Sequence, residues 1–205
     1  MPKRAAAQQK RKRTRLSAEL RQEQILEEAT KFIAQRGYHG FSLQELAERC
    51  RITIAGLLYY FGSKDRLLIA LLQHRVSRDT VALTWLRGES DTGKDSPLKS
   101  VVRSLHAIVE RNVTQPEIVR FYAVMRAEAL NRGHPAREFF ISRETYHVRL
   151  YTKMLVVAHV PQPESTARQL LALMMGLEEQ WLREDQSFDL LKEWDRGAAK
   201  LLPTR

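Results

Sequence analysis

Residues 41–72 read FSLQELAERCRITIAGLLYYFGSKDRLLIALL, and this stretch decides the fold. Leu43, Leu46 and Ala47 follow the i, i+3, i+4 spacing that places apolar side chains on one face of a helix. Ser42 stands just before this stripe and is followed three residues later by a glutamate, which is typical of a capping box. The pattern therefore predicts a short helix that begins directly after the serine.

A second short helix is predicted immediately downstream. Thr53 can cap it, Gly62 ends it, and Ser63 can cap the longer helix that follows. Its apolar face comprises Ile54, Leu57, Leu58 and Phe61. Two short helices joined by a tight turn describe a helix-turn-helix, whose second helix enters the major groove of DNA. The pattern alone leaves open that these are two core helices of an ordinary all-α domain.

The sequence TIAGLLYYFGSKDRLL at residues 53–68 resembles the recognition helix and the start of the next helix in the tetracycline-repressor (TetR) family of bacterial transcription regulators. Residues further upstream resemble the family's first helix and its entry into the second helix. They are Ile25, Leu26, Ala29, Phe32, Gly37, Phe41, Ser42 and Leu43. The resemblance covers residues 21–70 without gaps. It implies a DNA-binding regulator with a helix-turn-helix head and a helical body.

The resemblance also implies a set of DNA contacts. These residues are Ser42, Gln44, Thr53, Ile54, Ala55, Gly56, Tyr59, Tyr60 and Lys64. Residues at the front of the recognition helix would approach base edges, where an isoleucine can touch a thymine methyl group. Hydroxyl and ammonium groups would bind phosphates, which positions the protein without specifying a sequence. The family often has an aromatic residue where Leu58 stands, which leaves Tyr59 or Tyr60 to make that phosphate contact.

Composition agrees with an all-α, DNA-binding chain of about nine helices. The 205 residues include only nine Gly and seven Pro, and the formal net charge is +10. Residues 1–66 carry 14 Lys and Arg against 7 Asp and Glu, a surplus that suits binding to phosphates. We expect a disordered basic arm at 1–16, a DNA-binding domain at 17–66, and a ligand-binding and dimerisation domain at 67–205.

Helices in the body are predicted from proline starts and apolar periodicity. After the helix that follows Gly62 and runs to about residue 86, their expected ranges are 97–112, 116–130, 136–159, 164–184 and 188–202. Members of the resembled family bind a small effector in this region. The candidate pocket residues are Trp85, His106, Phe121, Tyr122, Met125, Arg126 and Tyr146, with Arg126 or His106 as the polar handle. Plain core packing is the alternative for each of them.

The last two predicted helices favour self-association. The first of them is apolar over more than half its face, so it needs a second partner besides its own body. The candidate dimer residues are Leu170, Leu173, Met174, Leu177, Trp181 and Trp194. Together with the resemblance they predict a homodimer, which would read a palindromic double-stranded DNA operator. An activator, or a DNA binder without an effector, would use the same head.

Several other classes of protein are disfavoured. We expect no enzyme, cofactor or metal site, because the sequence contains no catalytic motif and no Cys/His spacing typical of metal ligands. Cys50 is the only cysteine, so no intramolecular disulfide can form, which fits the cytoplasm. The longest apolar run, residues 170–177, is far too short to cross a membrane.

Overall fold

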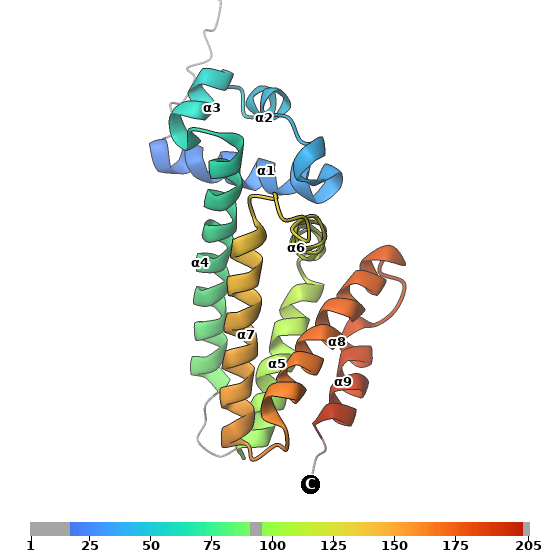
Figure 1. Cartoon of the computed structure of the whole chain (residues 1–205). Coiled ribbons are helices and arrows are strands. Elements are labelled where there is room, and N and C mark those ends of the chain that lie inside the picture. The colour runs from blue at the N-terminus through green and yellow to red at the C-terminus, as the bar shows by residue number, and fades with distance from the viewer. Residues whose placement is uncertain (1–16, 91–95, 203–205) are drawn as a thin grey trace, which may run out of the picture.

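A computed structural model of the protein describes the backbone of residues 17–90 and 96–202. It describes the side chains of the same residues except 78–90. Every regular element in these ranges is an α-helix (Figure 1). The head contains α1 (Ala18–Gly40), α2 (Leu43–Arg49) and α3 (Ile54–Phe61). Helix α4 (Lys64–Ser90) runs from the head into the body, which comprises α5 (Pro97–Val113), α6 (Pro116–Glu128), α7 (Arg137–Val157), α8 (Pro163–Arg183) and α9 (Leu190–Leu201). The all-α prediction is confirmed, and the predicted arm at 1–16 lies outside the described residues.

Local capping fixes the helix starts in the head. Each cap hydroxyl accepts a hydrogen bond from the backbone N–H three residues on, which satisfies a donor that the helix leaves unpaired. The four caps are Ser17 (3.2 Å), Ser42 (3.2 Å), Thr53 (3.0 Å) and Ser63 (3.1 Å). The capping box at Ser42 is only half formed, because the Glu45 carboxylate instead binds Arg36 at 2.8 Å.

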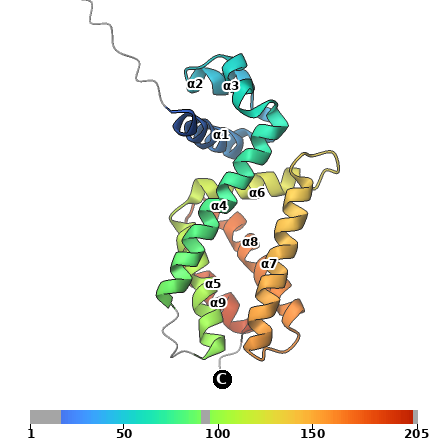
Figure 2. The same cartoon turned by 90° about the vertical axis from the view of Figure 1, so that its left-hand side faces the viewer.

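Two apolar cores lie along the long axis of the molecule. The first joins α1, α2, α3 and the start of α4, and it continues into the body through Phe121 and Met125 of α6 and Phe140 of α7. The second joins α5, α7, α8 and α9 around Trp194. Figure 2 shows α6 directly beneath the head, with α4 and α7 flanking the body. The head therefore shares its core with α6.

The close approach of α6 to the head requires a glycine in α1. Gly37 has φ +71° and ψ 175°, a conformation that essentially only glycine adopts, and it bends the end of the helix. A Cβ at this position would overlap the Glu128 carboxylate at the end of α6. Gly37 therefore interrupts the regular helix three residues before α1 ends at Gly40, and the glycine also makes room for α6.

Within the described part of the chain, we find no helix that combines the length and the apolar character needed to cross a membrane.

Candidate functional site

Helix α3 presents its first turn at the end of the molecule farthest from the body (Figure 1). Thr53, Ile54 and Ala55 are exposed, whereas Leu57 and Phe61 are buried and anchor the helix to the first core. The exposed residues are those that the sequence predicted to approach base edges. A helix held from one side in this way can offer its opposite edge to a groove.

The two tyrosines of α3 differ in their surroundings. Tyr59 is 86% exposed, whereas Tyr60 is partly buried and packs against the first core. Their rings meet edge to face with centroids 5.6 Å apart. Of the two candidates for the phosphate contact, Tyr59 is therefore the more exposed residue.

The predicted polar contacts already have partners in the free protein. The hydroxyls of Ser42 and Thr53 serve as helix caps, and Gln44 Nε2 donates to Glu48 Oε1 at 2.6 Å. The Lys64 ammonium lies 4.6 Å from the centre of the Tyr38 ring, and burial lowers its pKa. Each of these four polar groups therefore has a contact within the chain itself.

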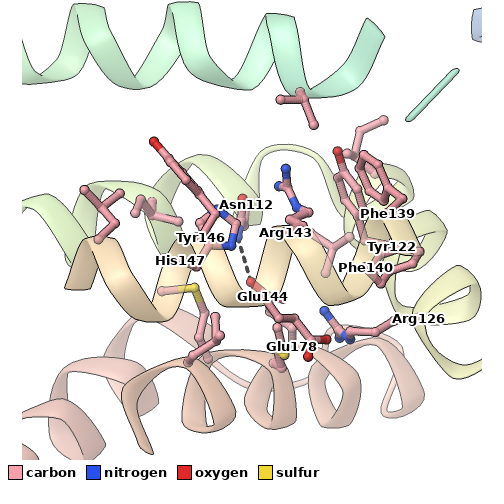
Figure 3. Close-up of a pocket in the computed structure, with 18 of the residues that line it drawn as sticks. Asn112, Tyr122, Arg126, Phe139, Phe140, Arg143, Glu144, Tyr146, His147 and Glu178 are labelled. Atoms are coloured by element: carbon pink, nitrogen blue, oxygen red, sulfur yellow. Dashed lines mark hydrogen bonds between the residues drawn. The ribbon is translucent and has the colours of Figure 1, made fainter. Parts of the chain in front are cut away.

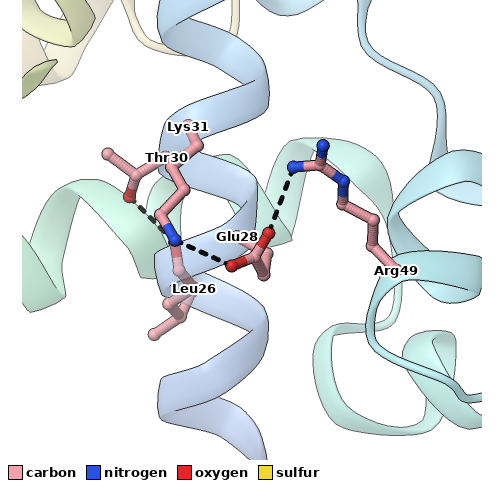
Figure 4. Close-up of polar contacts among 5 residues, drawn as sticks. All are labelled: Leu26, Glu28, Thr30, Lys31 and Arg49. Atoms are coloured by element: carbon pink, nitrogen blue, oxygen red, sulfur yellow. Dashed lines mark hydrogen bonds and ion pairs between the residues drawn. The ribbon is translucent and has the colours of Figure 1, made fainter.

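An ion-pair cluster braces α1 against the end of α2 (Figure 4). Glu28 binds Lys31 at 2.9 Å and Arg49 at 3.4 Å. The hydrogen bond from Lys31 and the charge of Arg49 lower the pKa of this carboxyl. The Arg49 guanidinium also lies 4.8 Å from the centre of the Phe32 ring. Arg49 thus links the end of α2 to α1 at the surface, while the buried Leu46 and Ala47 anchor α2 in the first core.

Glu128 connects the body to the head. Its carboxylate accepts a hydrogen bond from the Tyr38 backbone N–H at 2.8 Å and lies 3.5 Å from His134 Nε2. His134 is buried, and burial lowers its pKa. The Tyr38 hydroxyl in turn donates to Asp65 in the first turn of α4. One carboxylate of α6 is thus linked through Tyr38 to both α1 and α4.

The body contains a cavity of about 760 Å³ among α4, α5, α6, α7 and α8 (Figure 3). Most of its wall is aliphatic or aromatic, as in many small-molecule sites. The predicted residues Tyr122, Arg126 and Tyr146 line it.

Other predicted pocket residues lie elsewhere. Phe121 and Met125 are fully buried in the first core, because that face of α6 turns towards the head. His106 pairs with Asp195 of α9 at 2.9 Å and does not line the cavity. Trp85 lies in the part of α4 whose side chains are outside the described residues.

The cavity has a polar end that sequence reasoning missed. Glu178 of α8 is only 7% exposed and accepts a hydrogen bond from Asn112 Nδ2 at 2.6 Å (Figure 3). Beside it, Arg126 binds Glu179 Oε1 at 3.0 Å. The sequence could have indicated this buried carboxyl group, because Glu178 stands on the apolar face of the helix between Met174 and Trp181.

The predicted dimer residues have mixed surroundings. Leu170, Met174, Trp181 and Trp194 are buried in the chain's own second core. A buried side chain offers no surface to a second molecule, so the structure corrects the role of these four residues to core packing. The remaining two, Leu173 and Leu177, are only partly buried.

Comparisons with known proteins agree with this geometry. The sequence profile described as "Bacterial regulatory proteins, tetR family" matches residues 25–71. The chain is 26% identical over 169 residues to the HTH-type transcriptional regulator BetI of Paraburkholderia xenovorans, covering 80% of this chain and 82% of that protein. It is 29% identical over 86 residues to the uncharacterized HTH-type regulator YuxN of Bacillus subtilis. That match spans 42% of this chain and only 30% of that protein's length.

Solved structures show the same fold. A transcriptional regulator from Rhodococcus sp. Rha1 superposes with a TM-score of 0.73 at 19% identity, over 88% of this chain and 95% of that one. The regulator AibR, crystallised with isovaleryl coenzyme A and operator DNA, superposes with a TM-score of 0.70 at 21% identity. The match covers 90% of this chain and 100% of that chain.

Proposed function

This chain is a helix-turn-helix transcriptional regulator of the tetR family of bacterial regulatory proteins, and on that basis we propose that it is a cytoplasmic homodimeric repressor. It binds a palindromic DNA operator and leaves it when a small molecule occupies the body. The observation that carries the proposal is the placement of α3. Its leading edge is exposed at one end, while a cavity lies in the body behind the helices that support it.

Residues 17–66 act as the DNA-binding domain, with 1–16 as a basic arm along the duplex and 67–205 as the effector and dimer domain. Thr53, Ile54, Ala55 and Gly56 approach base edges, and Gln44 reaches a base or a phosphate. Tyr59, Tyr60, Lys64 and the Ser42 hydroxyl bind phosphates, with Tyr59 as the most accessible. Such binding weakens as salt rises, because it releases counterions from DNA.

Dimerisation uses the outer face of α8. Ala172 is exposed, and a Cβ on Gly176 would meet no atom within 4 Å, so a second helix can approach closely here. Leu173 and Leu177 lie partly exposed on the same helix and supply apolar area. The dimer must hold its two α3 helices about 34 Å apart, which is one turn of DNA, so that both can read a palindrome.

Effector binding acts on the heads through α4 and α6. Both helices line the cavity, and both contact the head, α6 through Glu128 and α4 through Asp65. A ligand that binds more tightly to a state with displaced heads than to the DNA-binding state lowers operator affinity. The reduction cannot exceed the difference between the ligand's affinities for these two states.

The test is a selection of bound duplexes from a random pool, followed by affinity measurements on the selected site. We expect a palindrome and a two-to-one protein-to-duplex stoichiometry. Lys64→Ala should weaken binding to all sequences, whereas Lys153→Ala, which removes an exposed lysine of α7, should not. A protein that remains monomeric and binds no duplex at low salt would refute the proposal. Increased transcription from the selected site would indicate an activator.

A further inference from the structure

A buried carboxyl group lies at the wall of the body cavity. Glu178 is 7% exposed, and it is the only acidic side chain among the buried polar residues of the described chain. It lines the cavity from α8 (Figure 3). Apolar side chains on the same helix, such as Leu170 and Trp181, belong to the second core. Burial of a carboxylate is unfavourable unless a partner compensates its charge, so its presence here requires an explanation.

The partners of Glu178 compensate its charge only in part. Asn112, which donates to it at 2.6 Å, is a neutral amide. The nearby Arg126 guanidinium is bound at 3.0 Å to the neighbouring Glu179. Burial raises the pKa of Glu178, although the Asn112 hydrogen bond and the charge of Arg126 oppose this effect. A further positive charge beside Glu178 would therefore be favourable.

The rest of the wall suits the apolar part of a cation. Aromatic side chains from α6 and α7 border the cavity, including Tyr122, Phe139 and Tyr146. Aromatic rings bury large apolar areas, so they suit the hydrocarbon part of such a ligand. The volume of about 760 Å³ lies within the range of sites for small organic molecules.

We propose that the cavity binds an apolar organic amine whose protonated nitrogen donates a hydrogen bond to the Glu178 carboxylate. Asn112 orients this carboxylate, and the aromatic wall contacts the hydrocarbon part of the ligand. The assignment rests on the effector function proposed above and names the chemical class of the effector.

An anionic ligand fits this end of the cavity less well. It would place a second negative charge beside Glu178, while Arg126 is already paired with Glu179. Arg111 and Arg143 also line the cavity, and the Tyr122 ring, whose centre is 4.7 Å from the Arg143 guanidinium, does not neutralise that charge. An anion would bind these two arginines and not the Glu178 end. The contrast between amine and carboxylate therefore tests the proposal directly.

The experiment is calorimetric titration of the full-length protein with three matched probes: phenylbutylamine, phenylbutanol and phenylbutanoate at neutral pH. We expect the amine to bind about 10- to 100-fold more tightly than the alcohol, the gain expected of a hydrogen bond between charged groups. Glu178→Gln should abolish this preference while the alcohol still binds, which also verifies folding. Glu164→Gln, which removes an exposed carboxylate from the same helix, should preserve the preference.

Three results would overturn the proposal: no binding of the amine, equal or tighter binding of the alcohol or the carboxylate, or an unchanged amine preference in Glu178→Gln. The comparison of probes on the unmodified chain decides the matter even if that variant does not fold. Operator release is measured separately. An amine that binds as expected but leaves operator affinity unchanged would support the ligand class and refute the effector role.

Discussion

Replacing Gly37 by alanine should destabilise the contact between head and body. The added methyl group would overlap the Glu128 carboxylate and displace it from the Tyr38 backbone N–H, to which it is bound at 2.8 Å. The backbone conformation at Gly37, with φ +71° and ψ 175°, would also be strained for any residue with a Cβ. The substitution therefore has two costs, one from strain and one from a lost hydrogen bond.

The expected magnitude is large relative to the stability of a typical domain. The strain costs about 1 to 3 kcal/mol. Loss of a hydrogen bond to a charged group costs a further 1.5 to 3 kcal/mol, roughly. Their sum is about 2.5 to 6 kcal/mol, against a typical unfolding free energy of 5 to 15 kcal/mol. Gly133→Ala is the matched control, because a Cβ there would make only an ordinary contact with Asn131.

A double-mutant cycle separates the two costs. In a Glu128→Ala background the hydrogen bond is already absent, so Gly37→Ala should cost only the strain. The coupling between the two sites should then be about 1.5 to 3 kcal/mol. The assay is guanidinium denaturation followed by circular dichroism, at one protein concentration because the stability of a dimer depends on it. Effects that add to within about 0.5 kcal/mol would refute the proposed clash between methyl group and carboxylate.

Three further predictions concern other parts of the molecule. Tyr59→Ala should reduce affinity about equally for several operator sequences in fluorescence anisotropy, because a phosphate contact positions without specifying; a sequence-dependent loss would contradict this role. The melting temperature of Glu178→Gln should rise relative to that of the original chain as pH increases above the ordinary carboxyl pKa. Burial raises the pKa of Glu178, so its ionisation at higher pH destabilises the folded state of the original chain only. Melting curves at a series of pH values test this, and a difference in melting temperature that does not change with pH would argue against it. Trp194→Ala should cost about 3 to 5 kcal/mol in denaturation experiments, because the indole is 1% exposed in the second core; a cost below 1 kcal/mol, roughly, would show that the site is loosely packed.

The boundaries of the helices were largely predictable because they depend on local signals. Pro97 and Pro116 begin helices as expected, and Ser42 and Thr53 cap theirs. A cap is a hydrogen bond between residues three apart, so its energy hardly depends on the rest of the fold. The predicted starts and ends of α5 to α9 consequently fall within two residues of the observed ones.

The cavity was predicted less well because its residues come from five helices. Periodicity shows that α6 has apolar faces, but it does not show which face turns towards the head and which towards the cavity. Phe121 and Met125 pack under α1, and Tyr122 and Arg126 line the cavity.

The sequence by itself determined the two short helices of residues 43–61 and their caps, since a cap joins residues that are three apart in the chain. Only the tertiary structure decided that α6 supports the head, that Trp194 belongs to the core, and that Glu178 faces a cavity beside Asn112. The physical reason is that burial and charge compensation depend on helices distant in sequence. Their relative rotation is set by the packing of the whole chain.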